Sequence, residues 1–162
     1  MRLHTLCPAY SPYHLPMAPK ATRPDLAAML APLFRNLIAA ELPILDKHGL
    51  SMWAYTVLLA LERSAVRSQA ALAEAIGADK TRIIPTLDDL QQRGYIERRP
   101  DPDDRRVRLL ALTEAGRAVK NAAQADIQRG EERWLSVLSN ADRRVFLRVL
   151  AQLTTADLPA RR

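Results

Sequence analysis

Residues 98–113 read RRPDPDDRRVRLLALT. Proline and aspartate between two apolar-containing runs are typical of a hairpin turn, so we expect two short strands, Tyr95–Arg99 and Val107–Leu112. The arginines are the informative residues of this segment: Arg105 and Arg106 fall at the tip, and Arg98, Arg99 and Arg108 on the arms. Guanidinium groups held beyond the body of a domain can reach a phosphate backbone or a minor groove. A solvated turn with internal ion pairs is the alternative interpretation.

Two short helices joined by Gly77-Ala78-Asp79 are expected directly before this hairpin. Ser68 can cap the first, Gln69–Ile76, and Asp79 the second, Lys80–Arg93, which Gly94 ends. A tight glycine-containing turn between short helices is typical of a helix-turn-helix, whose second helix enters the major groove. An amphipathic helix pair that binds nothing is the alternative.

The spacing of apolar residues orients this second helix. Ile83, Leu87 and Leu90 form an inward stripe, which leaves Thr81, Arg82, Pro85, Thr86 and Asp89 facing outward. Arg82 can bind the O6 and N7 acceptors of guanine, while Lys80, Thr81 and Thr86 suit phosphate or mixed contacts. Pro85 removes the hydrogen bond to the Thr81 carbonyl, so we expect a kink or an irregular first turn; its ring can also pack against a thymine methyl group.

Five further segments surround this core. Residues 1–24 contain five prolines and predict an irregular arm, within which Met17 is an alternative start. Asp25 can cap a helix to about Lys47, which Pro32 and Pro43 should kink or break. Ser51 can cap a helix to about Glu62 whose buried face includes Trp53, Val57, Leu58 and Leu61. Thr113 and Ser139 can cap two last helices, Glu114 to about Leu138 and Asn140–Leu153.

Composition is compatible with a mainly α protein that has a polyanionic partner. Aromatic residues make up 5% of the chain, hydrophobic residues 48%, and the net charge is +6. Residues 78–117 hold nine Lys or Arg and eight Asp or Glu, so any DNA-facing charge must come from geometry. The single cysteine, Cys7, excludes an internal disulfide and fits a reducing cytoplasm. No apolar run approaches the roughly 20 residues of a membrane span, so no membrane partner is expected.

Several segments in this order resemble the MarR (multiple-antibiotic-resistance regulator) family. The resemblance covers roughly Asp25–Leu153. It rests on GLSMW at 49–53, LAEAI at 72–76, DKTR at 79–82, LDDL at 87–90, RGYIER at 93–98 and DPDDRR at 101–106 followed by LTEAG at 112–116. The last two segments are the most specific.

The resemblance implies a mainly α fold with a small β-hairpin wing. A winged helix-turn-helix core (48–113) would be flanked by dimerisation helices at 25–47 and 114–162. The protein would be a homodimeric repressor or activator on a pseudo-palindromic double-stranded DNA, with half-sites about 34–36 Å apart. Arg105 matches the wing arginine that enters the minor groove, Asp103 matches the acid that orients it, and Arg106 is the alternative tip residue.

The resemblance also implies a small effector molecule, often an aromatic acid, between the dimerisation helices and the DNA-binding lobe. Candidate residues are Arg35, His48, Trp53 and Tyr55. Each has a simpler role open to it: Trp53 in the core, His48 in a loop, and Arg35 in a surface or interface ion pair.

Other classes of function have less support. His4, His14 and His48 are too scattered for a metal pair, and no phosphate loop or nucleophile motif is present, so neither an enzyme, a cofactor nor a metal is expected. No basic residue near Cys7 in the sequence indicates a reactive thiol, so a redox sensor is not expected either. The alternative from another class is a helical protein-interaction module that uses the winged fold without DNA.

Overall fold

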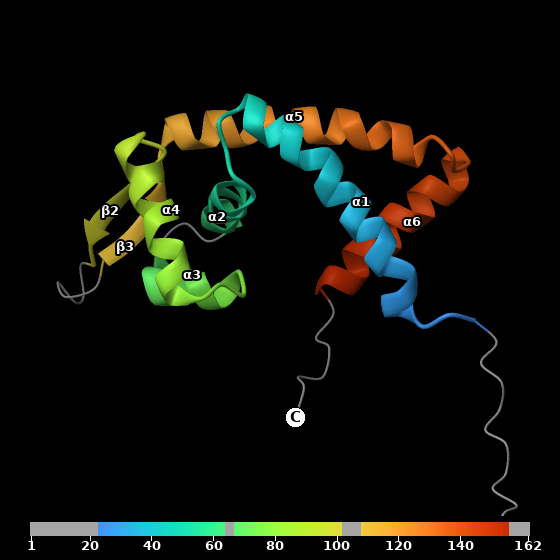
Figure 1. Ribbon diagram of the computed structural model, residues 1–162, viewed down its shortest axis with the longest axis horizontal. Coiled ribbons are helices and arrows are strands. Elements are labelled where there is room, and N and C mark those ends of the chain that lie inside the picture. Colours follow the sequence, from blue (N-terminus) through green and yellow to red (C-terminus); the bar gives the residue numbers. More distant parts are fainter. Residues whose placement is uncertain (1–22, 64–66, 102–107, 156–162) are drawn as a thin grey trace, which may run out of the picture.

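The computed structural model describes residues 23–63, 67–101 and 108–155. These residues form six helices and three strands, in the order α1 (Leu26–Lys47), α2 (Met52–Arg63), β1 (Arg67–Ser68), α3 (Gln69–Ala75), α4 (Lys80–Gln92), β2 (Ile96–Pro100), β3 (Arg108–Leu112), α5 (Glu114–Leu135) and α6 (Asn140–Thr155). Figure 1 shows an arch, with α5 along the top, a lobe of α2–α4 and the sheet at one end, and α1 and α6 at the other. The expected mainly α fold with a small hairpin is confirmed.

The core lies in the lobe, where three helices pack against the sheet. Its fully buried side chains include Val57, Leu58 and Leu61 of α2, Leu72 of α3, Leu87 and Leu90 of α4, and Ile96 and Leu110 of the sheet. The predicted inward stripe of the second short helix is therefore confirmed, because Ile83 is buried as well. The prediction that Trp53 is core is wrong: Trp53 is 49% exposed, and Leu50 and Ala54 occupy the buried positions around the start of α2.

The predicted capping residues set the helix starts. A backbone amide three residues later donates to the side chain of Asp25 (2.8 Å), Ser51 (3.1 Å), Ser68 (3.3 Å), Thr113 (3.0 Å) and Ser139 (3.1 Å), and Asp79 accepts from the Thr81 amide (2.7 Å). Such caps satisfy amides that have no partner within the helix. The helix-turn-helix turn and the end of α4 use Gly77 (φ 64°) and Gly94 (φ 71°), in the left-handed region that favours glycine.

The helices continue through all three prolines, so of the kink or break expected in α1, the break does not occur. Pro32 and Pro43 lie inside the continuous helix α1, and Pro85 lies inside α4. All three are exposed, as are Ala28, Ala39 and Thr81, whose carbonyls lose the amide donor. Water can therefore replace the missing donors, which lowers the cost of proline in a helix.

The hairpin is present, with arms one residue from the predicted bounds at three of their four ends. Strands β2 and β3 pair antiparallel, with Ile96 opposite Leu112 and Arg98 opposite Leu110. A third strand, which the sequence analysis did not predict, extends the sheet to the order β1-β3-β2: Arg67 pairs with Leu110, and Ser68 with Leu109. Two residues are too few for a periodic pattern, so this strand had no sequence signal.

The two helices at the other end of the arch leave apolar side chains exposed. None of the described α6 residues is buried, and Leu45 is the only buried residue of α1. Helix α1 is long and apolar enough to cross a membrane by length and composition, with a mean hydropathy of 1.4 in its most apolar window. The expectation that no segment meets these two criteria is therefore wrong, although the C-terminal part of α1 packs on α5 and the lobe.

Candidate nucleic-acid interface

Helix α4 presents the predicted polar face to solvent. Thr81, Arg82 and Pro85 are exposed and Thr86 is partly exposed, while Ile83, Leu87 and Leu90 point into the lobe. Among the described residues nothing pairs with the Arg82 guanidinium, so its donors are available to a ligand. The side chain of Lys80 lies outside the described part of the structure. The structure thus places Thr81, Arg82, Pro85 and Thr86 together on one face.

Asp79 organises the first turn of α4. Its carboxylate accepts the Thr81 amide at 2.7 Å and the Arg82 amide at 3.4 Å, and the Thr81 hydroxyl also donates to it. The hydrogen bonds from Thr81, followed by that from Arg82, hold the pKa of Asp79 below its ordinary value. The Thr81 hydroxyl is thus an acceptor toward solvent, and it must leave Asp79 before it can donate to a phosphate oxygen.

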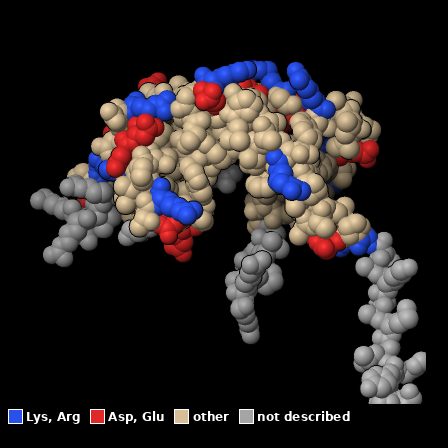
Figure 2. All heavy atoms as spheres, in the orientation of Figure 1, with Lys and Arg blue, Asp and Glu red and all other residues tan. Residues whose placement is uncertain are grey.

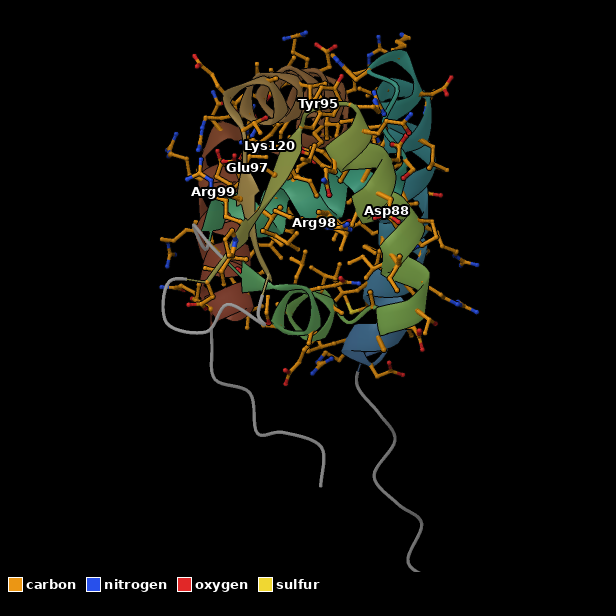
Figure 3. All side chains as sticks on the ribbon, turned by 90° about the vertical axis from the view of Figure 1, so that its left-hand side faces the viewer. Asp88, Tyr95, Glu97, Arg98, Arg99 and Lys120 are labelled. Carbon is orange, nitrogen blue, oxygen red and sulfur yellow. The ribbon has the colours of Figure 1, made fainter. Side chains whose placement is uncertain are left out.

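The hairpin is fixed beside α4 by an ion pair. Arg98 Nη2 of β2 lies 2.6 Å from Asp88 Oδ1 of α4. Glu97 and Arg99 pair at 2.5 Å on the opposite side of β2 (Figure 3). The Arg98 side chain therefore holds the hairpin against α4 and does not project from the hairpin into solvent. Asp103, Arg105 and Arg106, the predicted wing residues, lie outside the described residues.

A threonine and a glycine attach this hairpin to α5. Thr113 Oγ1 donates to the carbonyls of Gly94 (2.7 Å) and Tyr95 (3.0 Å) and accepts the Gly116 amide (3.0 Å). A Cβ atom at Gly116 would overlap with the Tyr95 carbonyl oxygen and lie 2.8 Å from its carbon. The absence of a side chain at Gly116 thus lets α5 begin directly against the turn between α4 and β2.

A buried lysine attaches α5 to α2. Lys120 is 2% exposed, and its ammonium group pairs with Glu62 and donates to Gln124 Oε1 at 3.3 Å. The hydrogen bond from Lys120 is the largest cause that lowers the pKa of Glu62. Lys120 was not predicted as a buried residue, because a lysine in a helix normally lies on the solvent face.

The four predicted effector residues differ in their exposure and their contacts. Tyr55 is buried and Arg35 is exposed, Trp53 is half-exposed, and His48 Nε2 lies 2.8 Å from Asp126 Oδ2. Burial, followed by the charges of Glu41, Glu131 and Glu62, raises the pKa of Tyr55 to about 12.

Among the described residues, a shallow surface hollow lies between α1 and α5. Its lining is made of Leu37, Ala40, Glu41, Ile44, Ile127, Gly130, Glu131 and Trp134, and it includes none of the four predicted residues. Burial is the largest cause that raises the pKa of both Glu41 and Glu131. Neither carboxylate was predicted as a site residue. No group of three or more His, Cys, Asp or Glu in the described ranges could hold a metal ion.

Comparison with known proteins agrees with this geometry. Residues 48–107, from just after α1 to just before β3, match the family model described as MarR family. An uncharacterised HTH-type transcriptional regulator of Bacillus subtilis, YdgJ, is 28% identical over 105 residues, which are 65% of this chain and 64% of YdgJ. This chain therefore aligns with less than two thirds of that relative.

Two solved structures of CouR are similar over most of this chain. CouR from Rhodococcus jostii RHA1 bound to p-coumaroyl-CoA is 26% identical and has a TM-score of 0.66, covering 84% of this chain and 96% of that one. The transcriptional repressor CouR bound to a 23-mer DNA duplex is 28% identical, with a TM-score of 0.68 over 80% of this chain and 92% of that one. The winged helix-turn-helix geometry and these matches together show that the chain is similar to MarR-family transcriptional regulators.

Proposed function

We propose that this protein is a sequence-specific DNA-binding transcriptional regulator that acts as a homodimer. The observation that carries the proposal is the face of α4 formed by Thr81, Arg82, Pro85 and Thr86. It lies on the second helix of a helix-turn-helix, next to a hairpin fixed to the same helix by Arg98 and Asp88. That arrangement is typical of proteins that place one helix in the major groove and a wing beside it.

Each exposed group of α4 has a role in the complex. Arg82 reads a guanine through two parallel hydrogen bonds, and Thr86 and Lys80 contact phosphates. The Pro85 ring packs against a thymine methyl group. The Thr81 hydroxyl accepts a hydrogen bond from a base amino group while its own proton is donated to the Asp79 carboxylate. Arg105 of the wing enters the minor groove, oriented by Asp103, with Arg106 as the alternative.

The second copy covers the apolar surface of α1 and α6. Large hydrophobic side chains exposed in the single chain are Leu26, Met29, Leu30 and Phe34 of α1 and Val145, Phe146, Leu147, Val149, Leu150 and Leu153 of α6. Few charged side chains lie on the visible face of the end of the arch that α1 and α6 form (Figure 2). Because contiguous apolar surface of this kind is typical of an interface, residues 25–47 and 114–162 form the dimer and 48–113 bind DNA.

A small molecule releases the repressor from DNA. The binding of p-coumaroyl-CoA by CouR supports this part of the proposal. The effector is a small aromatic acid held among Arg35, His48, Trp53 and Tyr55, and its carboxylate lies away from Glu41 and Glu131, which would repel it. The protein works in the cytoplasm and has no catalytic activity.

The test is a binding assay on the DNA upstream of its own and neighbouring genes. A dimeric DNA binder loses affinity steeply as salt rises, whereas a protein-interaction module, the alternative favoured by the exposed apolar faces of α1 and α6, binds no duplex even at low salt. Arg82→Ala should weaken specific binding by about 1–3 kcal/mol and relax one base preference. Arg105→Ala should weaken binding to all duplexes. A folded dimer that binds none of these duplexes at low salt would refute the proposal.

A further inference from the structure

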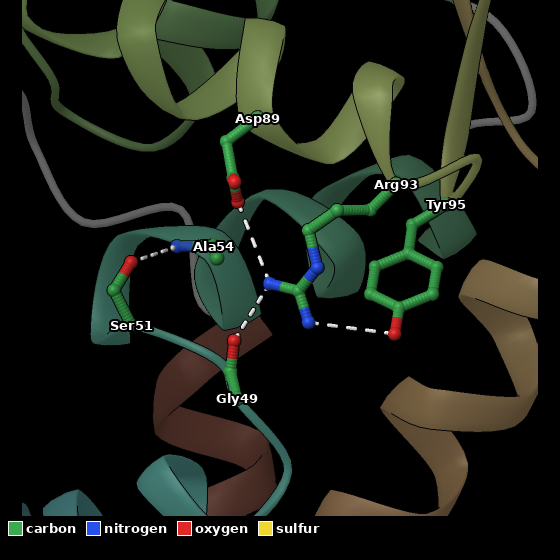
Figure 4. Close-up of polar contacts among 6 residues, drawn as sticks. All are labelled: Gly49, Ser51, Ala54, Asp89, Arg93 and Tyr95. Atoms are coloured by element: carbon green, nitrogen blue, oxygen red, sulfur yellow. Dashed lines mark hydrogen bonds and ion pairs between the residues drawn. The ribbon is translucent and has the colours of Figure 1, made fainter.

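One arginine connects the end of α4 to the segment between α1 and α2. Arg93 caps the C-terminus of α4, and its Nη1 donates to the Gly49 carbonyl at 2.7 Å, 44 residues away in the sequence (Figure 4). The same nitrogen lies 3.4 Å from Asp89 Oδ2, one turn back in α4. We call residues 48–51 the α1–α2 junction. The Arg93 side chain thus joins the helix that is proposed to read DNA directly to this junction by a hydrogen bond.

The Arg93 side chain is held in one orientation. Its Nη2 donates to the Tyr95 hydroxyl at 3.4 Å, and its Cζ lies 4.7 Å from the centroid of the Tyr95 ring. A carbonyl, a carboxylate and an aromatic ring therefore contact one planar guanidinium from three sides. Lysine has the charge but neither the fork nor the planar face, so it cannot replace these contacts together.

Gly49 is the residue that permits this approach. Its φ is +63°, and an added Cβ atom would lie 3.1 Å from Arg93 Nη2. A side chain at this position would therefore strain the backbone and press on the guanidinium at the same time. The contact can be perturbed from the junction without any change in α4.

The neighbouring residue ties the same junction to α5. His48 Nε2 lies 2.8 Å from Asp126 Oδ2, and Asp126 also pairs with Arg129 of α5. Adjacent junction residues are thus bonded to the long helix at the top of the arch and to the C-terminal end of α4. Thr81–Thr86, the face proposed to meet DNA, takes part in neither bond.

We propose that Arg93 is a positioning residue: it fixes α4 at the angle set by the α1–α2 junction, and so determines DNA specificity without contacting DNA. This inference rests on the proposed function. Base-edge contacts need a precise angle in the groove, whereas attraction to phosphates tolerates small rotations. Loosening Arg93 therefore lowers affinity for the preferred sequence and spares affinity for random DNA.

The experiment compares variants on two duplexes. The wild-type protein first selects its preferred duplex from a random-sequence library, and dissociation constants are then measured on that duplex and on a random one of equal length, over a range of salt. Arg93→Lys should bind the selected duplex about tenfold more weakly, since it loses charge-assisted hydrogen bonds. Random-duplex affinity should stay within about twofold, with an unchanged salt slope.

Arg117→Lys is the matched control. Arg117 Nη1 lies 3.3 Å from Glu62 Oε1, so it is another partly exposed arginine–carboxylate pair, outside the junction. Its ratio of selected to random affinity should equal that of the wild type. Gly49→Ala should lower the ratio as Arg93→Lys does, and the double variant should lose less than the product of the single losses, because both act on one contact.

Three results would overturn the inference. Equal losses on both duplexes with a salt slope smaller by about one would make Arg93 a phosphate contact. If a folded Arg93→Lys dimer binds both duplexes with the wild-type affinities, Arg93 has a structural role only and does not determine specificity. If Arg93→Lys does not fold, an unchanged ratio in Gly49→Ala refutes the inference. A wild-type protein that selects no duplex instead refutes the proposed function, which is a separate result.

Discussion

Gly116→Ala should destabilise the protein far more than its helical position suggests. In an exposed helix interior, alanine in place of glycine stabilises by about 1 kcal/mol. At residue 116 the added methyl group would overlap with the Tyr95 carbonyl oxygen and lie 2.9 Å from Leu112 Cδ1. Neither neighbour can move away alone, since Tyr95 contributes main-chain atoms and Leu112 belongs to β3.

The magnitude follows from three contributions. Forcing α5 away from the turn costs about 1–3 kcal/mol, the usual range for overpacking an interior. It also lengthens the hydrogen bond that the single Thr113 hydroxyl proton shares between the carbonyls of Gly94 and Tyr95, now 2.7 and 3.0 Å, which contributes about 1 kcal/mol. The gain in helix propensity offsets about 1 kcal/mol of this loss, which leaves a net destabilisation of about 2 kcal/mol.

Urea unfolding at fixed protein concentration measures this difference, with Gly130→Ala as the control. Gly130 lies in the same helix, and a Cβ atom there would meet only Ile44 Cδ1, at 3.4 Å. Gly130→Ala should therefore be neutral or stabilise by up to about 1 kcal/mol. Equal free energies of unfolding for the two variants would refute the close approach of α5 to Tyr95.

Three further predictions concern charge and the wing. Glu62→Gln should lower the free energy of unfolding by about 2 kcal/mol, because it leaves the buried Lys120 ammonium without its carboxylate. Lys120→Met should change it by no more than about 1 kcal/mol. A larger loss for Lys120→Met than for Glu62→Gln in urea unfolding would contradict the pairing. Glu41→Gln should raise the urea midpoint at neutral pH. The raised pKa of Glu41 means that its charged form disfavours the folded state above that pKa, so the gain should vanish as pH falls below the carboxyl's unfolded value. Asp88→Asn should lower affinity for the preferred duplex by releasing the wing through Arg98, and unchanged affinity would show that the ion pair does not hold it.

Local signals predicted much of the lobe. Capping by Ser51, Ser68 and Asp79 acts within three residues, and the apolar spacing of Ile83, Leu87 and Leu90 repeats within a helical turn. Both are visible in a sequence because their partners are neighbours in the chain. The same holds for the hairpin, whose turn residues lie between its two strands. The exposed face of α4 therefore follows from the spacing of residues in the sequence alone.

Other features depend on residues far apart in the sequence. The exposure of Trp53 follows from which elements cover the start of α2, and the unbroken helix through Pro32 and Pro43 follows from the solvent around them. The periodicity of α2 and the conformational cost of proline favour the opposite outcome in both cases, since each describes an isolated helix.

By itself, then, the sequence determined the helix starts, the glycine turns, the inward stripe of α4 and the hairpin, because each depends on interactions within a few residues. Only the tertiary structure decided how these parts are joined: Arg93 to Gly49, His48 to Asp126, and Lys120 to Glu62. These pairs lie 44, 78 and 58 residues apart, so no spacing rule links them. They form because packing the lobe against α5 brings donors and acceptors together where water is partly excluded.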